Sequence, residues 1–196
     1  MGVTHPLLDV LHAAADGVFP PADGRAVYLP PLPGGAAAVV SLTGRAYLAT
    51  ERRVPGLDGF GSALQPAVLR RIAGEREIGT LDVTLVACGQ GGGSLPVRTD
   101  LEDHPRVRHA RELRDSVQVY GDERGLVTVA VGLAGRTEMS VEVTTPGTGR
   151  ALIREALRLV PPGAPLFAAV APGNARSLRA FLAEGFVPLG SEVIIA

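Results

Sequence analysis

A glycine-containing turn at the start of a helix is the feature of this sequence with the clearest chemical meaning. Gly147, Thr148 and Gly149 follow an apolar run typical of a strand, and a helical pattern starts at Arg150. The first N–H groups of a helix have no partners inside the helix, so such a turn attracts anions, phosphate above all. Arginine pairs with phosphate through two parallel hydrogen bonds. The pattern predicts binding of a nucleotide-like or coenzyme-A-like ligand.

Acidic and phenolic side chains in the strands nearby are candidates for moving a proton. Side chains alternate along a strand, so Glu138 and Glu142 share one face of the predicted strand while Val141 and Val143 share the other. A partly buried carboxylate has a raised pKa and can act as a general base. Tyr120, in an upstream strand, is a further candidate. Solvated or ion-paired groups would give the same pattern, and that alternative stays open for each of them.

The elements around the turn are predicted from the residue pattern. Short β-branched runs separated by glycine-containing turns indicate an antiparallel meander. The last strand of the meander leads through a helix to another strand, and such a crossover makes the two strands parallel. Asn174 is predicted to cap a second helix, and Gly190 and Ser191 to turn a closing hairpin over residues 186–196. Strands are predicted at residues 117–120, 126–131, 138–143 and 165–171, and helices at 150–160 and 175–184.

The first half of the chain has its own pattern of short elements. Thr43 and Gly44 stand between two extended runs, and a two-residue turn with glycine predicts a hairpin, hence a small antiparallel sheet. The glycine-rich segment 88–94 follows a strand, and a flexible surface loop is favoured there over a phosphate cradle. Helices are predicted at residues 6–15, 63–73 and 104–114, and strands at 25–29, 37–42, 45–49 and 81–87.

The helix predicted at residues 104–114 has one basic face. Asp103 is its expected N-cap. Arg108, Arg111 and Arg114 are spaced three residues apart and therefore lie on the same side of the helix. Solvation of this face is the simpler interpretation, and recruitment of an acidic acceptor or a ligand phosphate is the functional alternative.

Composition limits the classes of function. The chain has 196 residues, of which 46% are hydrophobic and 20% charged, as expected for a folded globular protein. The single cysteine, Cys88, excludes an intrachain disulfide and a cysteine-ligated metal cluster, and all 19 basic residues are arginine, which excludes lysine chemistry. The net charge of −1 predicts no general attraction to nucleic acid or to a membrane. No apolar run approaches the roughly 20 residues of a membrane span, and the N-terminus lacks a signal-peptide pattern, so a cytoplasmic location is expected.

Residues 115–196 resemble the core of the GCN5-related N-acetyltransferase (GNAT) superfamily. The similarity lies in the order of the motifs: a meander, a strand leading to a Gly-x-Gly helix start, a strand, Asn-Ala-Arg-Ser opening a helix, and Gly185-Phe186 before the last segment. It implies an α/β fold, in detail an α+β mixed sheet that is mostly antiparallel, with one parallel β-α-β unit splayed at the cofactor cleft. Residues 1–114 would form an α+β extension on the acceptor side, packed on the same core.

The resemblance also implies a cofactor site. In the family, the strand before the helix separates from the next one, and acyl-CoA lies along its free edge with the pyrophosphate at the turn. No metal is implied. Carried over to this chain, the residues in contact with acyl-CoA would be Val141, Val143, Gly147, Thr148, Gly149, Arg150, Ala151, Asn174, Ser177 and Phe181.

The implied activity is transfer of an acyl group, in the first place acetyl from acetyl-CoA, to a small amine or a peptide N-terminus. The amine would attack the thioester directly, without a covalent enzyme intermediate, and Glu142, Glu138 or Tyr120 would serve proton transfer. Exposed terminal strands would allow a homodimer. Thr144 stands where the family has Arg or Gln, and Phe181 where many members have a general-acid Tyr. These two residues motivate the alternative of a GNAT-fold binding or regulatory module without acetyl transfer.

Overall fold

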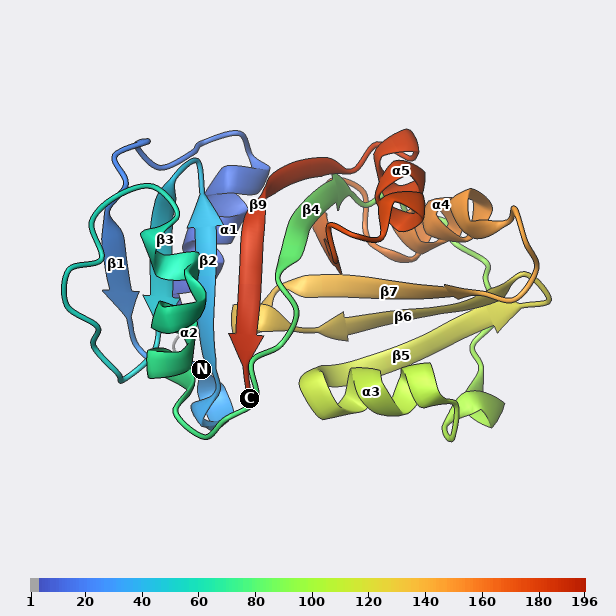
Figure 1. Ribbon diagram of the computed structural model, residues 1–196. Helices are drawn as coiled ribbons and strands as arrows, with labels where there is room; N and C mark the ends of the chain where they lie inside the picture. Colours follow the sequence, from blue (N-terminus) through green and yellow to red (C-terminus); the bar gives the residue numbers. More distant parts are fainter. Residues whose placement is uncertain (1–3) are drawn as a thin grey trace. The chain divides into compact units, whose positions relative to one another are not determined.

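The computed structural model of the protein describes residues 4–196, which contain five α-helices and nine β-strands (Figure 1). Two compact units are distinguished: the first comprises the residues up to Thr84 together with Pro188–Ala196, and the second comprises Leu85–Val187. Parallel and antiparallel strand pairs both occur, so the predicted mixed α/β class is confirmed. Helix α3 (Pro105–Leu113) packs within the second unit, and strand β9 (Val187–Ile195) pairs with β2 (Ala37–Leu42) in the first.

The first unit is built on a mixed sheet. Its elements are α1 (Pro6–Ala15), β1 (Ala26–Leu29), β2 (Ala37–Leu42), β3 (Arg45–Ala49), α2 (Pro66–Ala73) and β9. The strands lie in the order β1-β3-β2-β9. β2 is antiparallel to β3 and to β9, as the hairpin prediction requires, but β1 is parallel to β3. The prediction of a purely antiparallel sheet was therefore wrong, because the chain reverses direction twice between β1 and β3.

The turn between β2 and β3 has the predicted geometry. Thr43 and Gly44 have φ angles of 49° and 94°, and positive values at both positions are what a two-residue hairpin turn of this type requires. α2 begins at Pro66, because Ser62–Leu64 forms a separate 3-10 turn before it. Apolar side chains of α2 pack with those of β2, β3 and β9 in one core, and Figure 1 shows α1 behind the same strands.

The last strand is continuous, so the prediction of a closing hairpin was wrong. Gly190 pairs with Leu42 of β2, and Ser191 pairs with Ser41. A Cβ atom at Gly190 would lie 2.0 Å from the carbonyl oxygen of Ser41. The glycine at this position permits the close approach of two strands and does not form a turn.

The second unit contains the predicted meander and β-α-β unit. Its elements are the second part of β4 (Asp82–Cys88), α3, β5 (Asp115–Asp122), β6 (Gly125–Val131), β7 (Thr137–Val143), α4 (Gly149–Leu159), β8 (Pro165–Val170) and α5 (Ala175–Ala183). The strands lie in the order β4-β8-β7-β6-β5. β5, β6 and β7 are antiparallel neighbours, and β8 is parallel to β7, as predicted.

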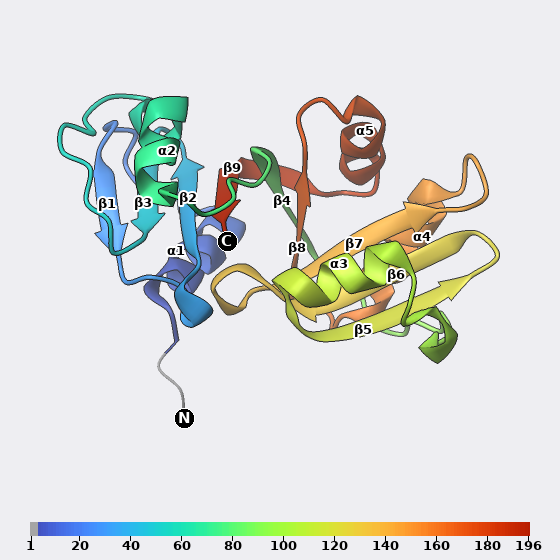
Figure 2. The ribbon, with the colours of Figure 1, turned by 60° about the horizontal axis from the view of Figure 1, so that its bottom comes forward.

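Helices α3 and α4 cover opposite faces of the meander (Figure 2). Val107 and Ala110 of α3 pack against the face of β5 and β6 that includes Leu126. α4 buries Ile153 and Leu157 and contacts β6 and β7. Because side chains alternate along each strand, the face that a β7 side chain occupies decides which of these helices it can meet.

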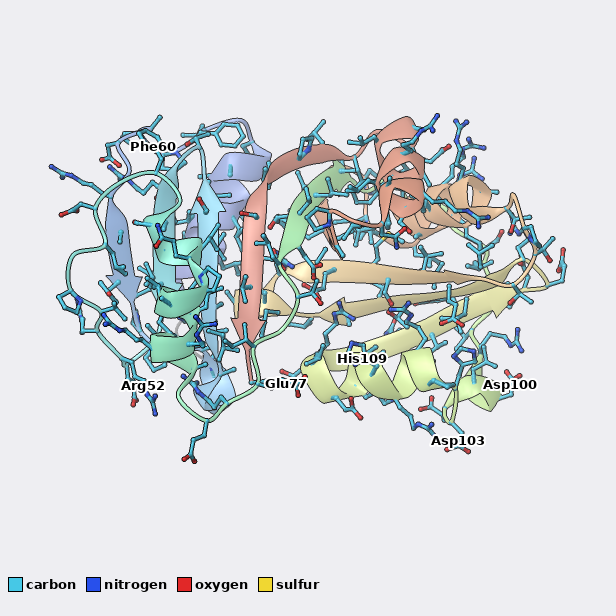
Figure 3. The ribbon with its side chains drawn as sticks, viewed as in Figure 1. Arg52, Phe60, Glu77, Asp100, Asp103 and His109 are labelled. Atoms are coloured by element: carbon cyan, nitrogen blue, oxygen red, sulfur yellow. The ribbon has the colours of Figure 1, made fainter. Side chains whose placement is uncertain are left out.

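The start of α3 differs from the prediction. The helix begins at Pro105, and its N-cap is His104, whose Nδ1 atom accepts a hydrogen bond from the N–H of Arg106 at 3.2 Å. Asp103 was predicted as the cap, but proline takes the first helical position and the residue directly before it holds the cap. The side chains of Asp103 and His109 extend into solvent (Figure 3).

Ion pairs occupy most of the basic face predicted on α3. Arg111 pairs with Glu102 at 2.6 Å, and Arg114 pairs with Glu138 of β7. Arg108 is exposed and has no ion-pair partner among residues 4–196. Two of the three arginines therefore hold the helix in place, and this part of the face is not free to recruit a ligand.

The glycine-rich segment after β4 is a largely exposed loop, as predicted, and hydrogen bonds join it to the end of α4. The N–H groups of Gln90, Gly91 and Gly93 donate to carbonyl oxygens at the C-terminal end of α4, at 2.7 to 2.9 Å. These carbonyls have no partners within the helix itself. A Cβ atom at Gly89 would lie 2.4 Å from the carbonyl oxygen of Pro161. The segment therefore caps the C-terminal end of α4, and it lies so close to the helix that only glycine fits there.

Candidate functional site

Strand β7 separates from β8 after a single paired position. The parallel ladder between these two strands contains the pair Glu138 and Phe167, and no other pair among residues 4–196. On its other side β7 stays paired with β6 from Thr137 to Val143. The C-terminal part of β7 therefore has one free edge.

One hydrogen bond shows which way the backbone of β7 faces. The N–H of Thr144 donates to the carbonyl oxygen of Arg124 at 2.9 Å, on the side of β6. In an antiparallel pair every second residue bonds to the same neighbour, so Glu142 faces β6 as well. The backbone N–H and C=O groups of Val141 and Val143 consequently point to the edge that β8 leaves free.

A cavity of about 490 Å³ lies at this free edge. Val141 and Val143 contribute to its wall from β7, and Gly147, Gly149 and Arg150 contribute from the turn and the first turn of α4. The volume lies within the range of small-molecule sites, roughly 300 to 1,000 Å³. The strand edge and the glycine turn, which were predicted to form one site, are brought together in one cavity.

The start of α4 presents backbone donors to this cavity. Thr148, its N-cap, makes no side-chain hydrogen bond to the helix, because its hydroxyl donates to the carbonyl oxygen of Thr145 at 2.7 Å. Within the described part of the chain, the N–H groups of Gly149, Arg150 and Ala151 have no acceptor. Thr148 and Ala151 are not in the cavity wall, so their side chains do not line the site. They contribute to it only through the backbone at the start of α4.

The turn before α4 needs its two glycines for different reasons. Gly147 has a φ of +88°, a conformation that glycine adopts far more readily than other residues, and a Cβ there would meet no atom within 4 Å. A Cβ at Gly149 would lie 3.2 Å from the Cγ2 atom of Val143. The first glycine shapes the turn beside open space, and the second lets the helix start close to the end of β7.

α5 and its N-cap form another part of the wall. Asn174, Ser177 and Phe181 line the cavity. The Oδ1 atom of Asn174 accepts a hydrogen bond from the N–H of Ser177 at 3.1 Å, which confirms Asn174 as the N-cap and leaves its side-chain NH2 group for a ligand. The buried ring of Phe181 packs edge to face on Phe186, with 4.9 Å between ring centres. It offers no proton donor.

Arginines give the cavity wall a positive charge. Arg150 donates its Nε–H to Glu184 at 2.7 Å, and this largely buried carboxylate also pairs with a second arginine of α4. Arg176, exposed in the first turn of α5, has no side-chain partner in the described part of the chain. Together with Arg106 they outnumber the one acidic residue of the wall, Glu142. This balance favours an anionic ligand.

Glu142 is the predicted base that lies in the cavity wall. Its Oε2 atom accepts a hydrogen bond from Nε of Arg106 at 3.3 Å, and Nε2 of His104 lies 3.8 Å from Oε1. Arg106 was not predicted as a site residue, because no local signal relates it to Glu142, 36 positions further along the chain. Arg176 was also missed, although its place in the first turn of a capped helix was a usable signal.

Glu138 and Tyr120, the other predicted bases, lie outside the cavity wall. Glu138 is buried between Arg114 and Arg136, with its Oε2 atom 2.7 Å from Nε of Arg136. Burial raises the pKa of Glu138, but the charges and hydrogen bonds of both arginines outweigh burial and lower it to about 2. Such a carboxylate is a weak base, which favours a structural role. The hydroxyl of Tyr120 is bonded to Gln118.

The described residues contain no group of three or more His, Cys, Asp or Glu side chains that could hold a metal ion. No helix within residues 4–196 is long and apolar enough to cross a membrane. A scan of the chain against protein-family models and a search of curated proteins found no match. The chemistry of the site therefore rests on its own geometry.

Proposed function

We propose that the protein is a GNAT-like acyltransferase that transfers an acetyl group from acetyl-CoA to an amine. The observation that carries the proposal is the free edge of β7 at Val141 and Val143, which faces a cavity that also contains the donor-rich start of α4. A ligand that fits both parts has amide groups along an extended arm and phosphates beyond them. Acyl-CoA has its groups in this order.

Two parts of the site would share the binding of acyl-CoA. The amides of the pantetheine arm can exchange hydrogen bonds with the backbone of Val141 and Val143, in the way that an added strand pairs with a sheet edge. The pyrophosphate would lie at the unpaired N–H groups of Gly149 and Arg150. Arg176, whose side chain has no partner among residues 4–196, adds a charge at the start of α5.

The proposed chemistry needs a thioester bound beside the carboxylate of Glu142. The lone pair of a neutral amine forms a C–N bond with the thioester carbon, the C–S bond breaks, CoA leaves as a thiolate that takes up a proton, and the amine nitrogen releases one. Glu142 would receive the amine proton directly or through a water molecule. Since a thiolate leaves readily, holding the amine against the thioester carbon supplies much of the rate.

A second candidate function is a GNAT-fold module that binds a ligand or a partner without acyl transfer. Phe181 favours it, because this buried ring lines the cavity and cannot give a proton to the leaving sulfur. The ion pair between Glu142 and Arg106 points in the same direction, since the Nε–H of Arg106 already occupies one oxygen of the carboxylate that would receive the amine proton. Such a module would use the cavity for binding only.

Titration with acetyl-CoA tests the cofactor part of the proposal. Gly149→Glu places a carboxylate among the N–H donors, and we expect its affinity for acetyl-CoA to fall by roughly tenfold or more. Gly149→Ala is the matched control, because it adds one carbon near a methyl group of Val143 and no charge. If millimolar acetyl-CoA does not stabilise the wild-type protein in a thermal-shift titration, the proposal is lost.

Thiol release separates the two candidate functions. The wild-type protein is incubated with acetyl-CoA and a panel of small amines and peptides, and the free thiol of CoA is measured. Release that depends on one acceptor rules out the binding module. Tight binding of acetyl-CoA without release for any acceptor supports the module.

A further inference from the structure

Arg106 is a cation of the cavity wall to which the proposed transfer assigns no role. It reaches the cavity from the first turn of α3, whereas Arg150 and Arg176 come from the first turns of α4 and α5. Its Nε–H donates to Glu142 at 3.3 Å, while its two Nη groups have no hydrogen-bond partner among residues 4–196. The outer edge of the guanidinium group is therefore available for a ligand.

Arg106 approaches the free edge of β7 from the face opposite to the glycine turn. Its partner Glu142 projects from the face that α3 covers. Val143, the next residue, projects to the other face, where a Cβ at Gly149 would lie 3.2 Å from its Cγ2 atom. Arg106 and the start of α4 thus reach the same cavity from opposite faces of strand β7.

The neighbouring basic residues Arg108 and His104 do not take the place of Arg106 in the cavity wall, and His104 lies near its partner Glu142. Arg108 is exposed and is not part of the cavity wall. His104 caps the helix through Nδ1, which leaves its Nε2 atom 3.8 Å from the second oxygen of Glu142. Glu142 therefore lies next to both His104 and Arg106, and it accepts the Nε–H of Arg106.

We infer that Arg106 binds a carboxylate of the acceptor, so that the acceptors are amines that also carry a carboxyl group, such as amino acids. The inference rests on the proposed acyl transfer. A carboxylate can accept two parallel hydrogen bonds from a guanidinium group. Arg106 and Glu142 place a positive and a negative group side by side, which matches the carboxylate and the ammonium group of such an acceptor. The same contact brings the amine within reach of Glu142.

The test compares amino acids with their carboxamides as acceptors of the acetyl group. For the wild-type protein we expect the acid to be preferred in kcat/KM by roughly 10- to 100-fold, because a charged hydrogen-bonded pair is lost in the amide. Arg106→Gln should remove this preference, and Arg106→Lys should keep a part of it. Arg108→Gln is the matched control on the same helix and should leave the preference unchanged.

Three results would overturn the inference: no preference for the acid in the wild-type protein, a preference that Arg106→Gln leaves intact, or an effect of Arg106→Gln on cofactor binding alone. The last result is examined with CoA and 3′-dephospho-CoA. If Arg106→Gln weakens binding of CoA and not of 3′-dephospho-CoA, Arg106 contacts the 3′-phosphate of the cofactor. Equal affinities of wild type and variant for both compounds are expected.

Binding measurements keep this test separate from that of the proposed function. Failure of the wild-type protein to bind acetyl-CoA defeats the proposed function, whereas binding without any preference for a carboxylate defeats only the inference. If the panel contains no acceptor that is turned over, the CoA-saturated protein is titrated with N-acetylglycine and N-acetylglycinamide by ligand-observed NMR. Absent binding of the acid, or binding no tighter than that of the amide, then overturns the inference.

Discussion

The Oε2 atom of Glu138 lies 2.7 Å from Nε of Arg136, and both side chains are buried. Arg114 pairs with the same carboxylate from the end of α3. A buried charge that loses its partner is costly, so this cluster joins β7 to α3 more firmly than a surface pair could. Glu138 lies on the same strand as the cavity residues Val141 and Glu142. Its ion pairs explain why its role is to stabilise the fold.

We predict that the ion pairs of Glu138 make stability depend on acid pH. Its pKa is lowered from 4.5 to about 2, so this carboxylate binds a proton less tightly in the folded than in the unfolded state. The stabilisation is complete above a pH of about 4.5 and is lost as the pH falls towards 2, by roughly 3 kcal/mol. Urea unfolding between pH 7 and 2 measures it.

Glu138→Gln is the variant that isolates this contribution. At pH 7 it should lower the free energy of unfolding by roughly 3 to 5 kcal/mol, because the buried carboxylate that pairs with Arg114 and Arg136 is replaced by an uncharged amide. The difference from wild type should shrink as the pH falls towards 2. Glu112→Gln, at an exposed glutamate of α3, should change stability little. A difference between Glu138→Gln and wild type that stays constant with pH would contradict the prediction.

Amide hydrogen exchange tests the free edge of β7 without any mutation. The N–H groups of Val141 and Val143 point away from β6 and should exchange rapidly, whereas those of Ser140 and Glu142 bond to β6 and should be protected. Acetyl-CoA should slow the exchange of the first pair and leave the second pair unchanged. Equal protection of all four N–H groups in the free protein would contradict the separation of β7 from β8.

The glycine-rich segment after β4 allows a comparison of three glycines. Gly89→Ala and Gly93→Ala should lower the free energy of unfolding by roughly 2 to 3 kcal/mol, because a Cβ would lie 2.4 Å and 2.8 Å from backbone atoms beside it. Gly92→Ala meets no atom within 4 Å and has only its positive φ to overcome, at about 1 kcal/mol. Similar losses for all three variants, measured by chemical denaturation, would show that the segment is not the cap described above.

Local signals in the sequence were sufficient for most elements of the fold. The spacing of the apolar residues predicted α1 over residues 6–15, and the hairpin at Thr43 and Gly44 followed from its two turn residues. Asn174 was found as an N-cap from its residue type and its place before a helix. In each case, the information that determines the structure lies within a few neighbouring residues.

The features that were missed depend on residues far apart in the sequence. Gly190 has the residue type of a turn, but the approach of β2 decides that it stays in a strand. The glycines of segment 88–94 were predicted to lie in a surface loop, but their hydrogen bonds to the end of α4 were not predicted. The contact of Arg106 with Glu142 likewise joins two elements whose packing no local pattern reveals. Intrinsic propensity tells which conformations a segment adopts readily, and tertiary contacts determine which of them forms.

Phe181→Tyr tests whether the missing proton donor limits acyl transfer. The side chain lines the cavity and is 3% exposed, and tyrosine adds only a hydroxyl group to the same ring. We expect kcat to rise by up to about tenfold, since the phenol would protonate the leaving thiolate. The wild-type reaction already proceeds through the positioning of the substrates. The KM for acetyl-CoA should stay unchanged. Phe181→Leu is the control for altered packing against Phe186, and a folded Phe181→Tyr variant with unchanged or lower kcat would show that Phe181 does not limit the reaction.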